Sequence, residues 1–89
     1  MASNRLASIG GGTGNVASGN SSTIGGGNNN AASNPWTTVS GGIINGAIND
    51  ISTVGGGISN LASGIASSVD GGVRNAASNF ASTVSTSSN

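Results

Sequence analysis

The chain of 89 residues lacks cysteine and histidine, and it has almost no charge. Its charged residues are two arginines and two aspartates, because lysine and glutamate are absent. Without cysteine no disulfide can form, and without histidine a Ser-His-Asp triad and a Cys/His zinc site are excluded. Arg5 and Arg74 cannot build the basic patch that nucleic acids require. The sequence therefore predicts no enzyme, no cofactor, no metal and no nucleic-acid partner.

Long apolar runs and aromatic residues are also scarce. No stretch of about 18 apolar residues exists that could cross a membrane, and residues 1–14 lack the apolar core of a signal peptide. We therefore expect no membrane insertion and no signal peptide in this chain. Trp36 and Phe80 are its two aromatic residues, and Gly, Ser, Ala, Asn and Thr dominate. By composition alone, the chain resembles a disordered Gly/Ser-rich linker.

An internal repeat with a period of fifteen residues argues against disorder. In the five complete units, positions three and four are Gly, position seven is Asn, position nine is Ala, and positions fourteen and fifteen are Ser or Thr. The phase holds from residue 2 onward without insertion or deletion, so residues 1–89 form a single repeat domain. A fixed phase means that each unit occupies an equivalent place in a stack. Position one, the branched aliphatic before the glycines, is Ile9, Ile24, Val39, Val54, Val69 and Val84.

Each unit contains two similar halves, in which polar and aliphatic residues alternate and a turn-forming residue follows. This pattern predicts a strand and then a turn, whereas paired glycines would weaken a helix by about 1 kcal/mol each. We expect positions one, seven, nine and fourteen to face inward and positions two, eight, ten and fifteen to face outward. Branched aliphatics would then pack opposite alanines, inward Asn and Ser would stack as ladders, and the glycines would supply turns with positive φ.

These features predict an all-β fold, a parallel β-solenoid (β-roll) of six coils with fifteen residues each. Coils about 4.8 Å apart would make a rod of roughly 28 Å. The glycine runs add no chemistry, because no lysine follows them as a Walker-type loop requires. Asp50 and Asp70 occupy different positions of the repeat and form no evident acid–base pair.

The stretch "STVGGG" at residues 52–57, followed by Asn60, Ala62, Ser63 and Gly64, resembles a known repeat. It is similar to the head repeats of trimeric autotransporter adhesins and to β-rolls of phage and viral fibres, over nearly the whole chain. The resemblance implies a left-handed roll whose three chains lie side by side, although the neck, stalk and membrane anchor of an adhesin are not in this sequence.

The same resemblance implies a structural role in a surface fibre, a filament or an adhesin head. Its partners would be copies of itself, as a homotrimer or a filament, and a host surface or matrix would be a further partner. We accordingly expect an extracellular, cell-surface or virion-associated location.

Apolar residues also occur at positions five, six, eight, twelve and thirteen, which we place at turns or facing outward. Two interpretations stay open: they fold over the turns as small clusters, or they form a lateral interface with a sister chain, as a contiguous exposed apolar strip suggests. In the first two coils, residues 13–15, 20–22 and 28–30 are polar, so a lateral contact should be tighter toward the C-terminal half. The residues are Trp36, Ile43, Ile44, Ile51, Ile58, Leu61, Ile65, Val73 and Phe80.

The strand edges at the ends of a solenoid suggest a second mode of association. Neither end of this chain carries the charge, proline or helix that usually caps such an edge. Met1 falls at position eight and Asn89 at position six, so a second molecule would continue the coil almost in phase. We therefore expect end-to-end stacking through Ala2, Ser3, Val84 and Asn89.

A hydroxyl column supports an alternative function. Outward position fifteen holds Ser or Thr in every coil, and plant ice-binding β-rolls have similar half-coils. The alternative is therefore an ice-binding solenoid that uses Thr23, Thr38, Thr53, Ser68 and Thr83. A passive spacer that binds nothing is the third interpretation.

Overall fold

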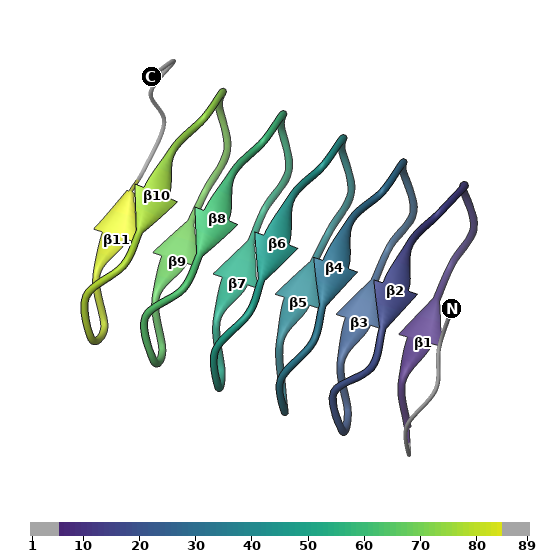
Figure 1. The fold of residues 1–89 in the computed structure, drawn as a ribbon, viewed down its shortest axis with the longest axis horizontal. Helices are drawn as coiled ribbons and strands as arrows, with labels where there is room; N and C mark the ends of the chain where they lie inside the picture. The colour runs from purple at the N-terminus through teal and green to yellow at the C-terminus, as the bar shows by residue number, and fades with distance from the viewer. Residues whose placement is uncertain (1–5, 85–89) are drawn as a thin grey trace.

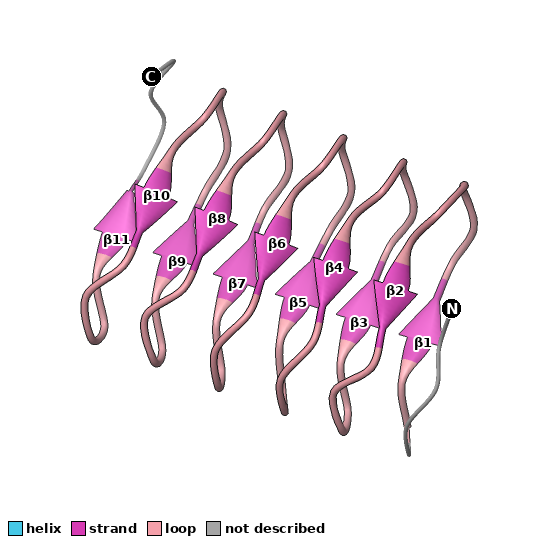
Figure 2. Cartoon of the chain, viewed as in Figure 1, coloured by secondary structure: helices cyan, strands magenta, loops and turns pink. Residues whose placement is uncertain are grey.

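The computed structural model describes residues 6–84, which form eleven short strands and no helix. The chain winds through successive flat coils, each of which contributes one strand to each of two parallel sheets (Figure 1). Turns and loops connect all the strands in this part of the chain (Figure 2). The odd-numbered sheet contains β1 (Ser8–Ile9), β3 (Thr23–Ile24), β5 (Thr38–Val39), β7 (Thr53–Val54), β9 (Ser68–Val69) and β11 (Thr83–Val84). The even-numbered sheet contains β2 (Val16–Ala17), β4 (Ala31–Ala32), β6 (Gly46–Ala47), β8 (Leu61–Ala62) and β10 (Ala76–Ala77).

The register of the sheets follows the sequence repeat. Val39 pairs with Val54 in the odd-numbered sheet, and Ala47 pairs with Ala62 in the even-numbered sheet. Every strand pairing is parallel and joins residues fifteen apart in the sequence, which confirms the all-β parallel solenoid. The described residues make about 5 turns, and the molecule measures 30 × 23 × 12 Å. The left-handed sense of the coil stays a prediction.

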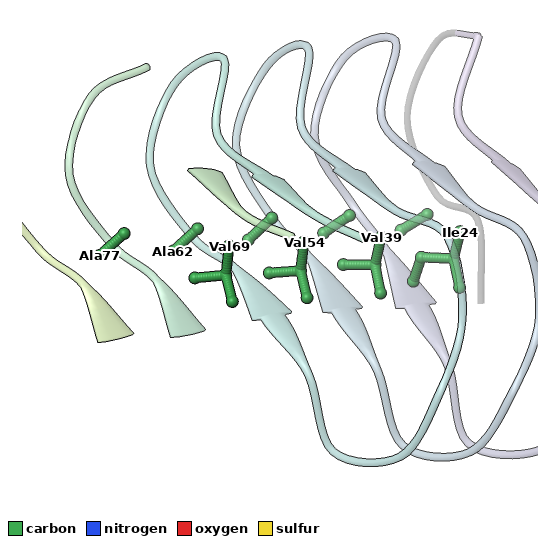
Figure 3. Packing of buried hydrophobic residues seen from close by; sticks show 9 residues of the cluster. Ile24, Val39, Val54, Ala62, Val69 and Ala77 are labelled. Atoms are coloured by element: carbon green, nitrogen blue, oxygen red, sulfur yellow. The ribbon is translucent and has the colours of Figure 1, made fainter. Parts of the chain in front are cut away.

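In the core between the two sheets, each coil contributes one inward side chain from each sheet. The odd-numbered sheet contributes the branched aliphatics of position one, and the even-numbered sheet contributes the alanines of position nine (Figure 3). Because a large residue faces a small one, the sheets approach closely enough to exclude water. Burial of each valine or isoleucine contributes about 1.5–3 kcal/mol. The buried residues are Ala17, Ile24, Ala32, Val39, Ala47, Val54, Ala62, Val69 and Ala77.

An asparagine ladder joins the coils at the first turn. The Asn45 Nδ2 amide donates to the carbonyl oxygens of Gly41 and Gly57, each at 2.9 Å. The Asn45 Oδ1 accepts the backbone N–H of Asn60 at 2.9 Å. Asn15, Asn30 and Asn60 likewise accept the backbone N–H of the asparagine in the next coil. The expected inward ladder is therefore present, and it satisfies backbone groups that the short strands do not pair.

The hydroxyl at position fourteen closes the second turn. Ser52 Oγ donates to the carbonyl oxygen of Asn49 at 2.6 Å, and the Ser52 backbone N–H reaches the same oxygen at 3.2 Å. Ser22, Thr37, Ser67 and Ser82 repeat the side-chain bond in their own coils. In the described part of the chain, every buried side-chain nitrogen or oxygen atom has a hydrogen-bond partner.

Glycine at position four is required both by conformation and by space. Gly57 has a φ of 98°, in the region that favours glycine. A Cβ atom added to Gly57 would lie 2.1 Å from the carbonyl oxygen of Gly72 in the next coil. The stacking distance of the coils therefore leaves no room for any other residue at this position.

Replacement of Asn45 by Ala should destabilise the fold strongly. The Gly41 carbonyl and the Asn60 N–H would lose their partner, whereas the Gly57 carbonyl still accepts the Ile43 N–H. Each unsatisfied group costs about 1–3 kcal/mol, so we expect a loss of about 2 kcal/mol or more. The control Asn28→Ala changes an exposed side chain at position five and should shift stability by about 0.5 kcal/mol at most. Urea unfolding followed by circular dichroism measures both, and equal effects of the two substitutions would contradict the structural role of the ladder.

Candidate functional site

The flattened coil presents four sides with different side chains. We name the outer side of the odd-numbered sheet, with positions fifteen and two, the hydroxyl face. The outer side of the even-numbered sheet, with positions eight and ten, is the apolar face. The turn at positions three to six forms the first edge, and the turn at positions eleven to thirteen forms the second edge. Together with the two ends of the rod, these four sides are the surfaces that a partner can contact.

The hydroxyl face carries one Ser or Thr per coil in exact alignment along the rod axis. Each of these residues pairs in register with the one in the next coil. In chain order they are Ser8, Thr23, Thr38, Thr53, Ser68 and Thr83. All six are exposed or half-buried, which confirms that position fifteen faces outward. The neighbouring position two is Gly in three coils and otherwise Ser40 or Asp70, so few side chains stand beside the hydroxyls.

The apolar face has the opposite composition. Position eight is nonpolar in every described coil, and position ten is Ser except at Ile48. No charged side chain belongs to this face within residues 6–84. From this face the sequence prediction named only Leu61 and missed Val16 and Ile48, which are 37% and 42% exposed. The signal was available, because position eight reads Val16, Ala31, Gly46, Leu61 and Ala76 in the five complete units.

Gly46 departs from the expected outward exposure of position eight. It is buried, because the side chains of Leu61 and Ile48 lie over it. A Cβ atom on Gly46 would lie 3.2 Å from Leu61 Cδ1 and 3.5 Å from Ile48 Cγ2. The two residues thus form a small ridge over the glycine while remaining partly exposed.

The first edge carries a stack of branched aliphatics in its C-terminal half. Ile43, Ile58 and Val73 pair in register at position five, as expected. Ile43 and Ile58 are each 44% exposed, and Ile44 at position six is exposed beside them. The same edge is polar in the two preceding coils, where position five is Thr or Asn.

The second edge carries one large apolar residue in each of four successive coils. These residues are exposed, with Trp36 and Phe80 protruding most. The nine residues of the expected lateral interface therefore do not form a single strip. Four lie on each edge and Leu61 lies on the apolar face, so three sides of the rod are apolar and the hydroxyl face is not. The four on the second edge are Trp36, Ile51, Ile65 and Phe80.

Both edges contain non-glycine residues in the left-handed backbone region, in addition to the glycines for which the sequence predicted it. Trp36, Ile44 and Ile51 have φ values of 57°, 58° and 59°. This conformation costs a residue with a Cβ atom about 1–2 kcal/mol. Gly14 and Asn29 at position six were the available signal, because glycine and asparagine tolerate positive φ best. The exposed side chains of Trp36, Ile44 and Ile51 recover little of this cost inside the chain.

The residues expected to stack end to end are only partly described. Val84 is half-buried and packs against the core cluster. Ala2, Ser3 and Asn89 lie outside the described residues, so their role stays a prediction.

The three charged residues within residues 6–84, Asp50, Asp70 and Arg74, lie on different sides of the rod. Asp50 Oδ1 accepts a hydrogen bond from Asn34 Nδ2 at 3.1 Å on the second edge. Residues 6–84 contain no group of three or more His, Cys, Asp or Glu side chains placed to hold a metal ion. The same residues include no helix with the length and apolar character needed to span a membrane.

Comparison with known proteins found no protein-family model and no curated protein that matches this chain. The functional argument therefore depends on the fold and on the composition of its four sides.

Replacement of Ile44 by Asn should stabilise the chain. Asparagine tolerates positive φ better than a β-branched residue, so part of the backbone cost of about 1–2 kcal/mol is removed. The exposed Ile44 side chain contributes little burial in return. We expect unfolding free energy at low protein concentration to rise by about 0.5–1 kcal/mol. Thermal and urea unfolding measure the change, and a clear loss of stability would show that Ile44 packs more tightly than its exposure indicates.

Proposed function

We propose that the chain is a non-enzymatic structural protein, a β-roll that associates with copies of itself in a surface fibre, filament or adhesin head. The observation that carries this proposal is the exposure of large apolar side chains on three of the four sides of an almost uncharged rod. Contiguous apolar patches of this kind mark interaction sites. With two arginines and two aspartates in the chain, a partner chosen by charge is disfavoured.

Lateral association is the first form of this proposal. The two apolar edges flank the apolar face, so a chain that turns this face toward a bundle axis would also bring both edges to its neighbours. The resemblance to adhesin heads makes three chains the expected number. Apart from Leu6, which is exposed at position thirteen, the large apolar residues of the two edges begin with Trp36 and Ile43. The contact would therefore be strongest from the middle of the rod onward.

End-to-end stacking is the second form. Each coil directs backbone donors toward the next, as Thr38 N–H does to the carbonyl oxygen of Ser52 at 3.0 Å. A further coil finds the same donors and acceptors whether it belongs to the same chain or to a second copy. A fibre outside the cell or on a virion, extending toward a host surface or matrix, is the role that this assembly would serve.

Molecular mass in solution tests the proposal. Light scattering after size exclusion should give a multiple of the 8.3 kDa chain mass, rising with concentration, with three chains as the expected lateral unit. Electron microscopy of the concentrated protein separates the two forms, because stacking yields filaments and lateral association alone yields short particles. A constant mass of one chain at every concentration would contradict self-association and would favour a passive spacer.

The hydroxyl column favours ice binding as a second candidate function. Its hydroxyls repeat at the coil spacing on a face with few other side chains. If this face binds ice, the protein should produce thermal hysteresis or arrest recrystallisation. Thr53→Lys should abolish the effect, and Ser63→Lys on the opposite face should preserve it. Unhindered ice growth at millimolar protein would exclude this candidate.

A further inference from the structure

We infer that the apolar face, and not either edge, is the surface that a second copy of the chain buries. This inference rests on the proposed self-association and specifies where it takes place. The edges carry most of the exposed large apolar residues, so the assignment is not evident from residue size. It follows from composition, from area and from the repeat.

The apolar face shares one property with an interface core, which is the absence of charge. Interface cores are depleted in charged residues, whereas charges are tolerated at the rim. Among the described charged residues, Asp70 lies on the hydroxyl face, Arg74 on the first edge and Asp50 on the second edge. The apolar face alone combines a nonpolar column with the absence of charge in residues 6–84. Its Ser column can form hydrogen bonds with the same column of a second copy without burying an ion.

Area also distinguishes the face from the edges. A stable interface buries roughly 800 Å² on each partner. From the molecular extents of 30, 23 and 12 Å, the face offers about 690 Å² (30 × 23) and one edge about 360 Å² (30 × 12). A single edge therefore offers about half the area of the face and lies well below the standard interface size. The face approaches the required area, and the adjoining edges can then add their isoleucines at the rim.

The repeat indicates that the partner on this face is a second copy of the chain. Side chains on the face recur once per coil, and Gly46 pairs in register with Leu61 and Ala31 on either side. A partner that lacks this spacing would lose alignment with the rows after one or two coils. An identical chain has the same spacing, so its rows of side chains stay aligned with those of the first chain along the whole rod. The same spacing also lets the Ile48–Leu61 ridge fit between rows of the partner.

The ridge near the middle of the face should be the centre of the contact. Ile48 and Leu61 rise over Gly46, while Ala31 and Ala76 leave shallower positions in the coils before and after them. A ridge beside shallow positions is self-complementary when two copies meet. Residues in desolvated positions near the centre of an interface contribute most of its binding energy, so Ile48 is the most informative residue to change.

Lysine substitutions at residues of equal exposure test the assignment. Ile48 on the apolar face and Ile65 on the second edge are both 42% exposed, so Ile48→Lys and Ile65→Lys are matched, and Thr53→Lys controls for the hydroxyl face. Burying an unpaired ammonium at an interface is costly. We expect Ile48→Lys to raise the concentration at half-association about tenfold or more, and the other two to change it less than about threefold. Circular dichroism verifies the fold of each variant, and Ser63→Lys on the same face serves if Ile48→Lys does not fold.

The outcomes separate this inference from the proposed function. If the unchanged chain remains a monomer at all concentrations, self-association itself is wrong. If it associates and Ile65→Lys or Thr53→Lys dissociates it while Ile48→Lys does not, self-association stands and the assignment to the apolar face is overturned. Loss of association in the apolar-face variants alone supports both.

Discussion

The side-chain amide of the inward asparagine connects each coil to the next where the two-residue strands cannot. Asn45 binds two glycine carbonyls and the backbone N–H of Asn60 at the first turn. A typical hydrogen bond contributes only about 0.5–1.5 kcal/mol net, whereas an unpaired buried group costs about 1–3 kcal/mol. The ladder therefore stabilises the fold mainly by preventing unpaired backbone groups. It also fixes the coil length, because each asparagine must lie directly above the previous one.

The remaining features of the coil follow from this close stacking. Glycine at position four has no alternative, since an added Cβ atom on Gly57 would overlap the backbone of the next coil. A core of one branched aliphatic and one alanine per coil keeps the two sheets near each other. Because that core is thin, side chains outside positions one, seven, nine and fourteen face outward or lie at the turns. Close stacking and a thin core thus make the rod narrow and give it four surfaces that are large for its mass. The composition of those surfaces determines what the chain can bind.

Much of the fold could be predicted from the sequence because the orientation of one repeat position determines the orientation of the others. Once Val54 is placed inward, strand alternation places Ser52 inward and Thr53 outward, and the fixed period carries the assignment through every coil. The turns could not be predicted as well. Positive φ at Ile44 contradicts the usual preference of a β-branched residue, and only the geometry of the stacked coil imposes it. Burial of Gly46 likewise depends on where Leu61 and Ile48 lie in space.

The surface was harder to predict than the core for a related reason. The sequence prediction selected mainly large apolar residues, and eight of the nine expected contact residues lie on the edges. The apolar face depends instead on small residues such as Ala31 and Ala76 and on the absence of charge. Only the placement of positions eight and ten on one flat side shows that they form a continuous surface.

Amide hydrogen exchange measured by NMR tests the asparagine ladder most directly. The Asn60 N–H is bonded to the Asn45 side chain, and the Thr53 N–H is bonded to the Ser67 carbonyl within the strand ladder. If the ladder holds the coils together, the Asn60 amide should exchange as slowly as the Thr53 amide, with an opening free energy close to that of global unfolding. Exchange of Asn60 at the rate of an unstructured peptide, while Thr53 stays protected, would contradict the account.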